Sequence, residues 1–185
     1  MPNSHLGEIE LPEFGMPERQ PTVPPGIYAN RLEELRNRAS ERGFDFVLVY
    51  ADREHSANLS YLSGFDPRFE EALLIVAPTE EPVILVGNEC RGMAAAAPLA
   101  MSVRLFQDFS LPGQPRGESD TLARILVDEG MAQRSRVGVV GWKTFPEQRL
   151  LDVPSYIADE IRAIVGRDNV QKATDILSDA ADGMR

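Results

Sequence analysis

The chain has 185 residues, 43% of them hydrophobic, and a formal net charge of −10 at pH 7. A chain of this length suits one domain, which buries about 70% of its unfolded surface and needs no metal or disulfide to fold. The excess of 29 acidic over 19 basic residues argues against nucleic-acid binding, because that affinity depends on Lys and Arg side chains that neutralise phosphates.

Three sequence features bear on location. Cys90 is the single cysteine, so an intrachain disulfide is excluded and a reducing compartment is indicated. The first 25 residues carry four glutamates and no apolar core, unlike a signal peptide. Since no apolar stretch approaches the roughly 20 residues that a membrane helix needs, we expect a cytoplasmic protein with no membrane and no nucleic-acid partner.

Proline marks the first segment of the chain. Residues 1–25 hold six of the 14 prolines and show no sustained periodicity. Proline removes backbone donors and favours extended backbone, which predicts a flexible arm. The folded domain is expected to begin at residue 26.

A helix and a strand are predicted next. Asn30 and Glu33 are spaced like a capping box at the start of the helix, and Gly43 closes it. The apolar segment Phe46–Ala51 follows at once and is typical of a strand that is buried on both faces. The apolar face of the helix is formed by Tyr28, Leu32, Leu35 and Ala39.

The next two predicted strands decide the type of sheet. Leu73–Ala77 and Val83–Gly87 are joined by only five residues. A parallel crossover needs roughly a dozen residues, so these strands are expected to pair antiparallel. The sheet should therefore be mixed, which separates this chain from proteins with an all-parallel nucleotide-binding sheet.

The remaining segments alternate between helix and strand. This alternation predicts one α/β domain, residues 26–177, with a mixed β-sheet flanked by helices. The expected elements are a helix at Glu89–Ala97, a strand at Val103–Phe106, a helix at Ser119–Glu129, a strand at Val137–Gly141, a helix with Pro154 in its first turn and Gly166 at its end, and a short strand from Val170.

Catalytic patterns are missing from the sequence. His5 and His55 are the only histidines, and no pair of ligands has the spacing of a metal site. The chain lacks the GxSxG, GxGxxG and GxxxxGK[ST] motifs. Cys90 precedes an alanine-rich segment and is interpreted as a small packing residue, although a helix amino terminus can also activate a thiol. We therefore predict no catalytic residue and no metal ligand in this segment.

Two polar loops are the candidate contact sites. The loop at Asp52–Asn58 follows the first strand and contains His55, and the turn at Asp66–Glu70 carries a guanidinium and an aromatic ring. Loops at the carboxyl ends of strands are where α/β proteins place binding groups. The alternatives are a solvated loop for the first segment and a core position for Phe69.

The order of the motifs resembles a known family. Phe46–Ala51, the block Asn58-Leu-Ser-Tyr-Leu-Ser-Gly-Phe65, Glu71–Val76 and Pro82–Glu89 follow one another as in the amino-terminal domain of the creatinase, prolidase and Xaa-Pro aminopeptidase family. The resemblance covers about residues 27–177, and the block that ends at Phe65 is its most specific part.

The resemblance implies a ribonuclease H-like mixed sheet placed before a catalytic domain of the pita-bread type. In relatives that second domain holds two divalent metal ions through two Asp, one His and two Glu, and none of these ligands has a counterpart here. Residues 178–185 would begin the linker to it. Relatives commonly form homodimers in which the amino-terminal domain of one subunit helps to wall the active site of the other. On this analogy the residues that line a partner's cleft are His55, Arg68, Phe69 and Glu70.

Three functional hypotheses follow. The first is a non-catalytic domain for dimerisation and substrate gating, part of a metal-dependent hydrolase that acts on a peptide next to proline or on a small guanidino compound such as creatine. The alternative is a stand-alone protein- or peptide-binding module of the same fold without enzymatic activity. A third, a flavodoxin-like or nucleotide-binding protein, is disfavoured by the missing phosphate loop.

Overall fold

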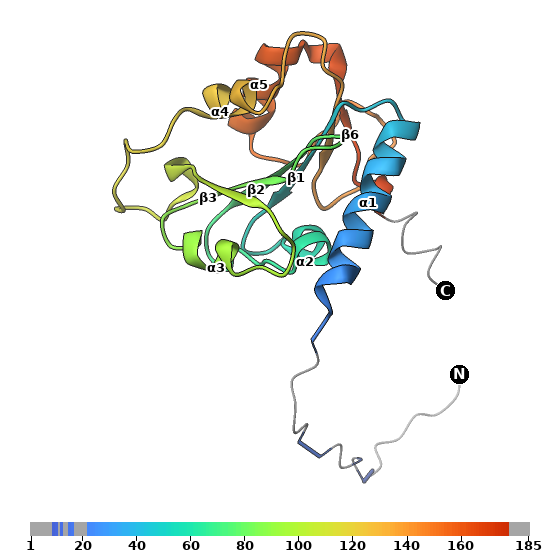
Figure 1. Ribbon diagram of the computed structural model, residues 1–185, viewed down its shortest axis with the longest axis vertical. Coiled ribbons are helices and arrows are strands. Elements are labelled where there is room, and N and C mark those ends of the chain that lie inside the picture. Colours follow the sequence, from blue (N-terminus) through green and yellow to red (C-terminus); the bar gives the residue numbers. More distant parts are fainter. Residues whose placement is uncertain (1–8, 11, 13–14, 17–21, 178–185) are drawn as a thin grey trace, which may run out of the picture.

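A single mixed sheet forms the centre of the molecule. The computed structural model describes residues 9–10, 12, 15–16 and 22–177. Within these residues the strands form a six-stranded sheet in the order β4-β3-β2-β1-β5-β6 (Figure 1). The strands are β1 (Phe46–Ala51), β2 (Ala72–Val76), β3 (Val83–Val86), β4 (Ser102–Leu105), β5 (Val137–Val140) and β6 (Val170–Lys172).

Strand β2 is the one described strand that opposes the others. It pairs antiparallel with β1 on one side and with β3 on the other, while β3–β4, β1–β5 and β5–β6 are parallel pairs. The antiparallel pairing of β2 and β3 and the mixed character of the sheet are therefore confirmed. As a consequence, every strand except β2 points its carboxyl end toward the same edge of the sheet.

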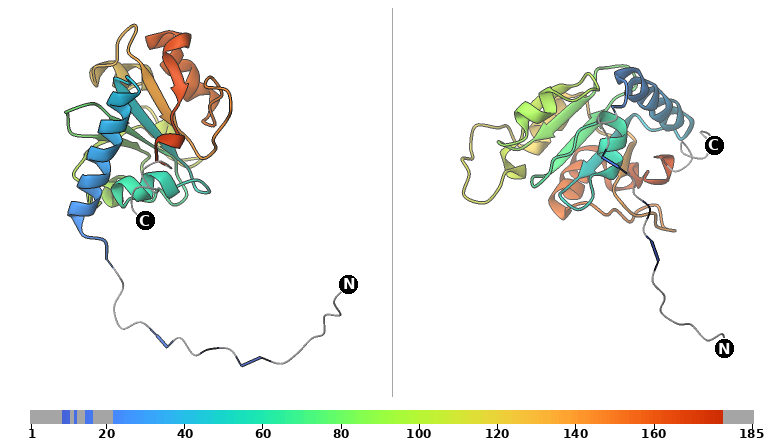
Figure 2. Two further views of the ribbon diagram at one scale, coloured as in Figure 1. Left: turned by 90° about the vertical axis from the view of Figure 1, so that its right-hand side faces the viewer. Right: turned by 90° about the horizontal axis from the view of Figure 1, so that it is seen from below.

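Helices cover both faces of this sheet. Helices α1, α2 and α3 lie on one face, and α4 and α5 lie on the other (Figures 1 and 2). Their bounds are α1 (Pro25–Glu41), α2 (Ala57–Ser63), α3 (Arg91–Ala95), α4 (Leu122–Asp128) and α5 (Ser155–Val165), with single 3₁₀ turns η1 (Gln107–Phe109) and η2 (Arg167–Asn169).

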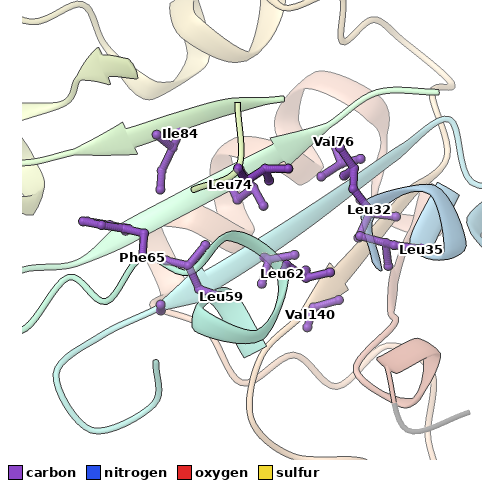
Figure 3. Close-up of a cluster of buried hydrophobic side chains, with 14 of the residues drawn as sticks. Leu32, Leu35, Leu59, Leu62, Phe65, Leu74, Val76, Ile84 and Val140 are labelled. Carbon is purple, nitrogen blue, oxygen red and sulfur yellow. The ribbon is translucent and has the colours of Figure 1, made fainter. Parts of the chain in front are cut away.

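Each face has its own apolar core, separated by the sheet. Figure 3 shows the cluster beneath α1 and α2, where Leu35, Leu62 and Leu74 are almost completely buried. The cluster on the other face contains Leu48 and Ile161, both with 0% exposure. Because β1 contributes side chains to both clusters, all six of its residues are buried, as predicted.

The start of α1 differs from the prediction. The helix begins at Pro25 rather than near Asn30, and Asn30 and Glu33 both lie inside it, so the capping-box interpretation is wrong. Proline suits a first helical position because its missing N–H has no helical acceptor there and its φ is already helical. The predicted apolar face of four residues is buried, as expected.

Three other boundaries shift by a few residues. Helix α4 begins at Leu122 and not at Ser119 as predicted. Its N-cap is Thr121, whose side chain accepts from the N–H of Arg124. Pro154 is the N-cap of α5 rather than part of its first turn. Helix α3 is shorter than predicted and covers only part of the expected Glu89–Ala97 helix.

The predicted arm and linker stay predictions. Most of residues 1–25, with His5, and all of 178–185 lie outside the described residues.

The described helices have no membrane-spanning character. None of them combines the length and the apolar composition that crossing a bilayer requires.

Candidate functional site

The loops at the carboxyl edge of the sheet form the candidate site. Ala51, Ala72 and Val86 are neighbours in register across β1, β2 and β3, so the loops that follow β1 and β3 and the turn that precedes β2 meet at one edge. Strand β5 is parallel to β1 and adds the segment after Val140. In α/β sheets ligands bind outside this edge. The two loops predicted as contact sites are therefore both found there.

The first loop holds its histidine in one orientation. Asp52 Oδ1 accepts from the backbone N–H of Glu54 at 2.9 Å and of His55 at 2.8 Å, and it lies 2.9 Å from Nδ1 of His55. The imidazole also stacks on the ring of Trp142, with centroids 4.0 Å apart and planes 19° apart. His55 is thus a half-buried residue of a rigid loop, with an aromatic partner from the end of β5.

Trp142 was missed by the sequence reasoning. The segment Val137–Gly141 was interpreted only as a buried strand, and the tryptophan directly after it received no role. The available signal was the position of a lone tryptophan at the carboxyl end of a predicted strand. Trp142 is 36% exposed, and Nζ of Lys143 lies 5.8 Å from the centroid of its ring.

The segment that carries Trp142 is anchored on both sides. The side-chain amide of Asn58 donates to the carbonyl of Gly141 at 2.6 Å, and the carboxylate of Asp152 accepts from the N–H groups of Trp142 and Lys143, each at 2.5 Å. A Cβ at residue 141 would overlap that carboxylate, which explains the glycine. The tryptophan is therefore presented from fixed backbone.

The second loop presents an arginine and a phenylalanine. Asp66 Oδ1 accepts from the N–H of Arg68 at 2.8 Å, and Arg68 has a φ of 61°, in the left-handed region that few non-glycine residues adopt. Among the described residues, no hydrogen bond or ion pair is recorded for the Arg68 guanidinium. The ring of Phe69 is 50% exposed, so the alternative that it is a core residue is wrong. We call this segment, Asp66–Phe69, the 66–69 turn.

Glu70 differs from the other predicted site residues because its side chain is only 2% exposed. One carboxylate oxygen accepts from the N–H of Glu89 at 3.2 Å and the other from the N–H of Cys90 at 3.1 Å. The carboxylate is directed toward the backbone that follows β3 and not toward solvent.

A carboxylate held by two tyrosines is the other feature that sequence reasoning missed. Oε2 of Glu71 accepts from the hydroxyl of Tyr50 at 2.8 Å and from that of Tyr156 at 2.9 Å. Burial, followed by the negative charge of Glu71, raises the pKa of both tyrosines far above the ordinary value of 10. These residues come from β1, β2 and α5, and their distance along the chain hides the cluster from any local motif.

Two shallow hollows flank Glu71. The first has a volume of about 200 Å³, and its lining includes Asp52, Phe69 and Glu70. The second, of about 410 Å³, is lined among others by Glu71 and Tyr156. Phe69 and Glu70 thus share one hollow, whereas His55 and Arg68 line neither. The structure brings the four predicted residues to one edge but not into one pocket.

Metal binding and thiol chemistry both depend on how the His, Cys, Asp and Glu side chains of the described residues are arranged. These residues contain no group of three or more His, Cys, Asp or Glu side chains arranged to hold a metal ion. The thiol of Cys90 is fully buried, and burial, with the neighbouring Glu70, raises its pKa to about 12, which keeps it protonated and unreactive.

Comparison with known families gives one match that covers most of the chain. The family model for the Creatinase/Prolidase N-terminal domain matches residues 31–179. No curated protein sequence matches the chain.

Solved structures show the same fold. The prolidase from Pyrococcus horikoshii OT3 (TM-score 0.55, 14% identity) aligns with 82% of this chain and 34% of its own. The dipeptidase PepE from Mycobacterium ulcerans (0.55, 17%) aligns with 84% and 36%. A Xaa-Pro aminopeptidase structure from Streptococcus thermophilus (0.54, 14%) aligns with 83% of this chain and 98% of its own. The chain thus spans about a third of the first two relatives.

Proposed function

Because the chain belongs to the creatinase/prolidase N-terminal domain family, we propose that it is the non-catalytic amino-terminal domain of a metal-dependent hydrolase that cleaves peptides next to proline. The chemistry would belong to a further domain with two divalent metal ions, which would supply an activated water for hydrolysis of the peptide bond. The structural relatives include a prolidase and a Xaa-Pro aminopeptidase, which favours a proline peptide over a small guanidino compound such as creatine.

The observation that carries this proposal is the 66–69 turn. It carries the exposed ring of Phe69 next to Arg68, whose guanidinium has no hydrogen-bond or ion-pair partner within the described part of the chain. The Asp66 carboxylate accepts from the Arg68 N–H, and Arg68 adopts a left-handed φ. A guanidinium binds a carboxylate with two parallel hydrogen bonds, and an aromatic ring packs against an apolar side chain. These are the groups that a short peptide offers.

The turn would act on a neighbouring subunit. In the proposed homodimer, Arg68 and Phe69 of one subunit help to close the active site of the other, and His55, stacked on Trp142, forms a second contact at the same edge. Aromatic and Arg side chains are enriched at such interfaces. The domain would thus gate the substrate and support dimerisation in the cytoplasm.

The experiment uses the protein encoded by the whole reading frame, loaded with Mn²⁺ and assayed on an Xaa-Pro dipeptide, an Xaa-Pro tripeptide and creatine. Arg68→Ala and Phe69→Ala are expected to raise KM about tenfold with kcat changed less than about twofold, because they remove substrate contacts and not the reacting groups. The matched control is Arg91→Ala, an exposed arginine in α3.

Two results would overturn the proposal. Unchanged kinetics for Arg68→Ala and Phe69→Ala would remove the gating role. A reading frame that supplies no metal-binding domain would instead favour a stand-alone peptide-binding module, for which the relevant measurement is the affinity of the chain for Xaa-Pro peptides.

A further inference from the structure

Glu70 combines a charge with almost complete burial, directly beside an exposed turn. A carboxylate removed from water is costly unless hydrogen bonds replace its hydration. Here both oxygens are satisfied by backbone N–H groups, those of Glu89 and Cys90. The side chain therefore connects the start of β2 to the segment that follows β3.

Gly87 makes room for this connection. A Cβ at residue 87 would lie 2.7 Å from the carboxylate carbon of Glu70 and from both of its oxygens. Real Cβ contacts are not that short, so any larger residue at this position would push the carboxylate away from its donors. The glycine and the glutamate are thus matched in shape, although they lie on different segments of the chain.

Glu70 and Cys90 also contact the 66–69 turn directly, through the carbonyl group of Pro67. The carbonyl of Pro67 accepts from the N–H of Glu70 at 3.2 Å and from the thiol of Cys90 at 3.0 Å. These bonds are made directly beside Arg68, whose φ of 61° is unfavourable for a side chain with a Cβ. Such a backbone conformation persists only where the surroundings determine it.

We propose that Glu70 is a positioning residue that fixes the 66–69 turn and thereby sets the location of Arg68 and Phe69. Its carboxylate locks the end of the turn to the backbone of Glu89 and Cys90, and Gly87 provides the space. The inference rests on the proposed function for its consequence in catalysis, but the conformational claim stands on this chain alone.

The locked segment in turn supports the wall of the adjacent hollow. The N–H of Asn88 donates to the hydroxyl of Ser110 at 3.0 Å, and the side-chain amide of Gln107 donates to Asn88 Oδ1 at 3.0 Å. Ser110 and Glu70 both line the hollow of about 200 Å³. A displaced Glu70 should therefore disturb the turn and the hollow together.

The first test uses the 185-residue chain and measures backbone amide exchange by NMR. In Glu70→Ala and Gly87→Ala, exchange at Glu89 and Cys90 should accelerate at least about tenfold, and the amides of Arg68 and Phe69 should become mobile. Gly92→Ala is the matched control, because a Cβ at residue 92 meets nothing within 4 Å. If Glu70→Ala does not fold, Glu70→Gln and Gly87→Ala keep the test decisive.

A double substitution checks that the glycine acts through the glutamate. Gly87→Ala should disturb the turn in the native background and add almost no effect in the Glu70→Ala background, where the clash is gone. Equal effects in both backgrounds, or unchanged exchange at the turn in Glu70→Ala, would overturn the assignment of Glu70.

The second test uses the full-length enzyme and separates this inference from the proposed function. Glu70→Gln and Gly87→Ala should raise KM about three- to tenfold with kcat nearly constant, as for loss of a substrate contact, while Gly92→Ala changes neither. If Arg68→Ala raises KM but Glu70→Gln and Gly87→Ala do not, Glu70 is not a positioning residue. If Arg68→Ala itself has no effect, the proposed function fails, and amide exchange alone decides whether Glu70 fixes the turn.

Discussion

The buried thiol shows how the surroundings of one residue set its chemistry. Cys90 has 0% exposure, its thiol donates to the Pro67 carbonyl, and Glu70 lies close by. Burial and this negative charge both disfavour the thiolate, which is the reactive form. Of the two interpretations open at the sequence level, a packing residue and an activated thiol, the structure supports the first.

Cys90 should therefore resist modification in the native state. At pH 8 we expect the folded protein to react with a disulfide reagent such as DTNB at least about a hundredfold more slowly than the urea-unfolded chain, because its thiol has a pKa of about 12 whereas an unfolded cysteine titrates near pH 8.5. Absorbance of the released thiolate measures both rates, with Cys90→Ser as the blank. Labelling of the folded protein as fast as free glutathione would contradict the packing role.

At the scale of elements, the turn after α2 depends on a glycine. Gly64 ends the helix with a φ of 73°, and its N–H donates to the carbonyl of Ser60. A Cβ at this position would overlap the ring of Pro98 and lie 3.0 Å from Tyr28. The glycine is therefore required both by its backbone conformation and by the close approach of two other segments.

Two alanine substitutions distinguish the strain and overlap expected at Gly64 from the ordinary effect of replacing a helical glycine by alanine. Gly64→Ala should lower the free energy of unfolding by about 1–3 kcal/mol, through strain and overlap. Gly26→Ala, in the first turn of α1 where a Cβ meets nothing within 4 Å, should instead raise it by a few tenths to about 1 kcal/mol, because alanine is the better helix former. Urea unfolding monitored by circular dichroism measures both. Equal losses in the two variants would rule out a special role for Gly64.

The elements themselves were predicted well where one local signal decides them. The five-residue connection between β2 and β3 excludes a crossover, so the antiparallel pair followed from length alone. The start of α1 was misjudged because Pro25 was assigned with the other prolines to the flexible arm, whereas in the structure it opens the helix and Tyr28 is one of the buried helix residues. Local patterns cannot rank such alternatives.

At the scale of the whole molecule, the candidate site was predictable only in part. The loops that carry His55 and Phe69 were identified because they adjoin strong strand signals. Trp142, which stacks on His55, lies 87 residues further along the chain, and Tyr156, which donates to the carboxylate of Glu71, lies 85 residues from it. The strand order β2-β1-β5 is what brings these segments to the same edge. Sheet order of this kind leaves no local mark in a single sequence.

Three groups at the sheet edge, two tyrosine hydroxyls and one thiol, have raised pKa values, and these should make the stability of the protein depend on pH in the alkaline range. Tyr50 and Tyr156 share the carboxylate of Glu71, and Cys90 lies near Glu70. In each case the native state holds its proton more tightly than the unfolded chain, in which cysteine titrates near pH 8.5 and tyrosine near pH 10. Below these values both states are protonated and the groups have no effect on the pH dependence.

The unfolded chain loses these protons first as the pH rises, so it binds fewer protons than the native state and the free energy of unfolding falls. We expect the urea midpoint to be nearly constant from pH 7 to about 8.5 and to decrease steadily from there to about pH 11. Tyr50→Phe should flatten the decrease by removing one of the groups, and Glu71→Gln should flatten it partly, because burial would still act when the negative charge is gone. A decrease that is equally steep in Tyr50→Phe and the native protein would show that alkaline unfolding originates elsewhere in the molecule.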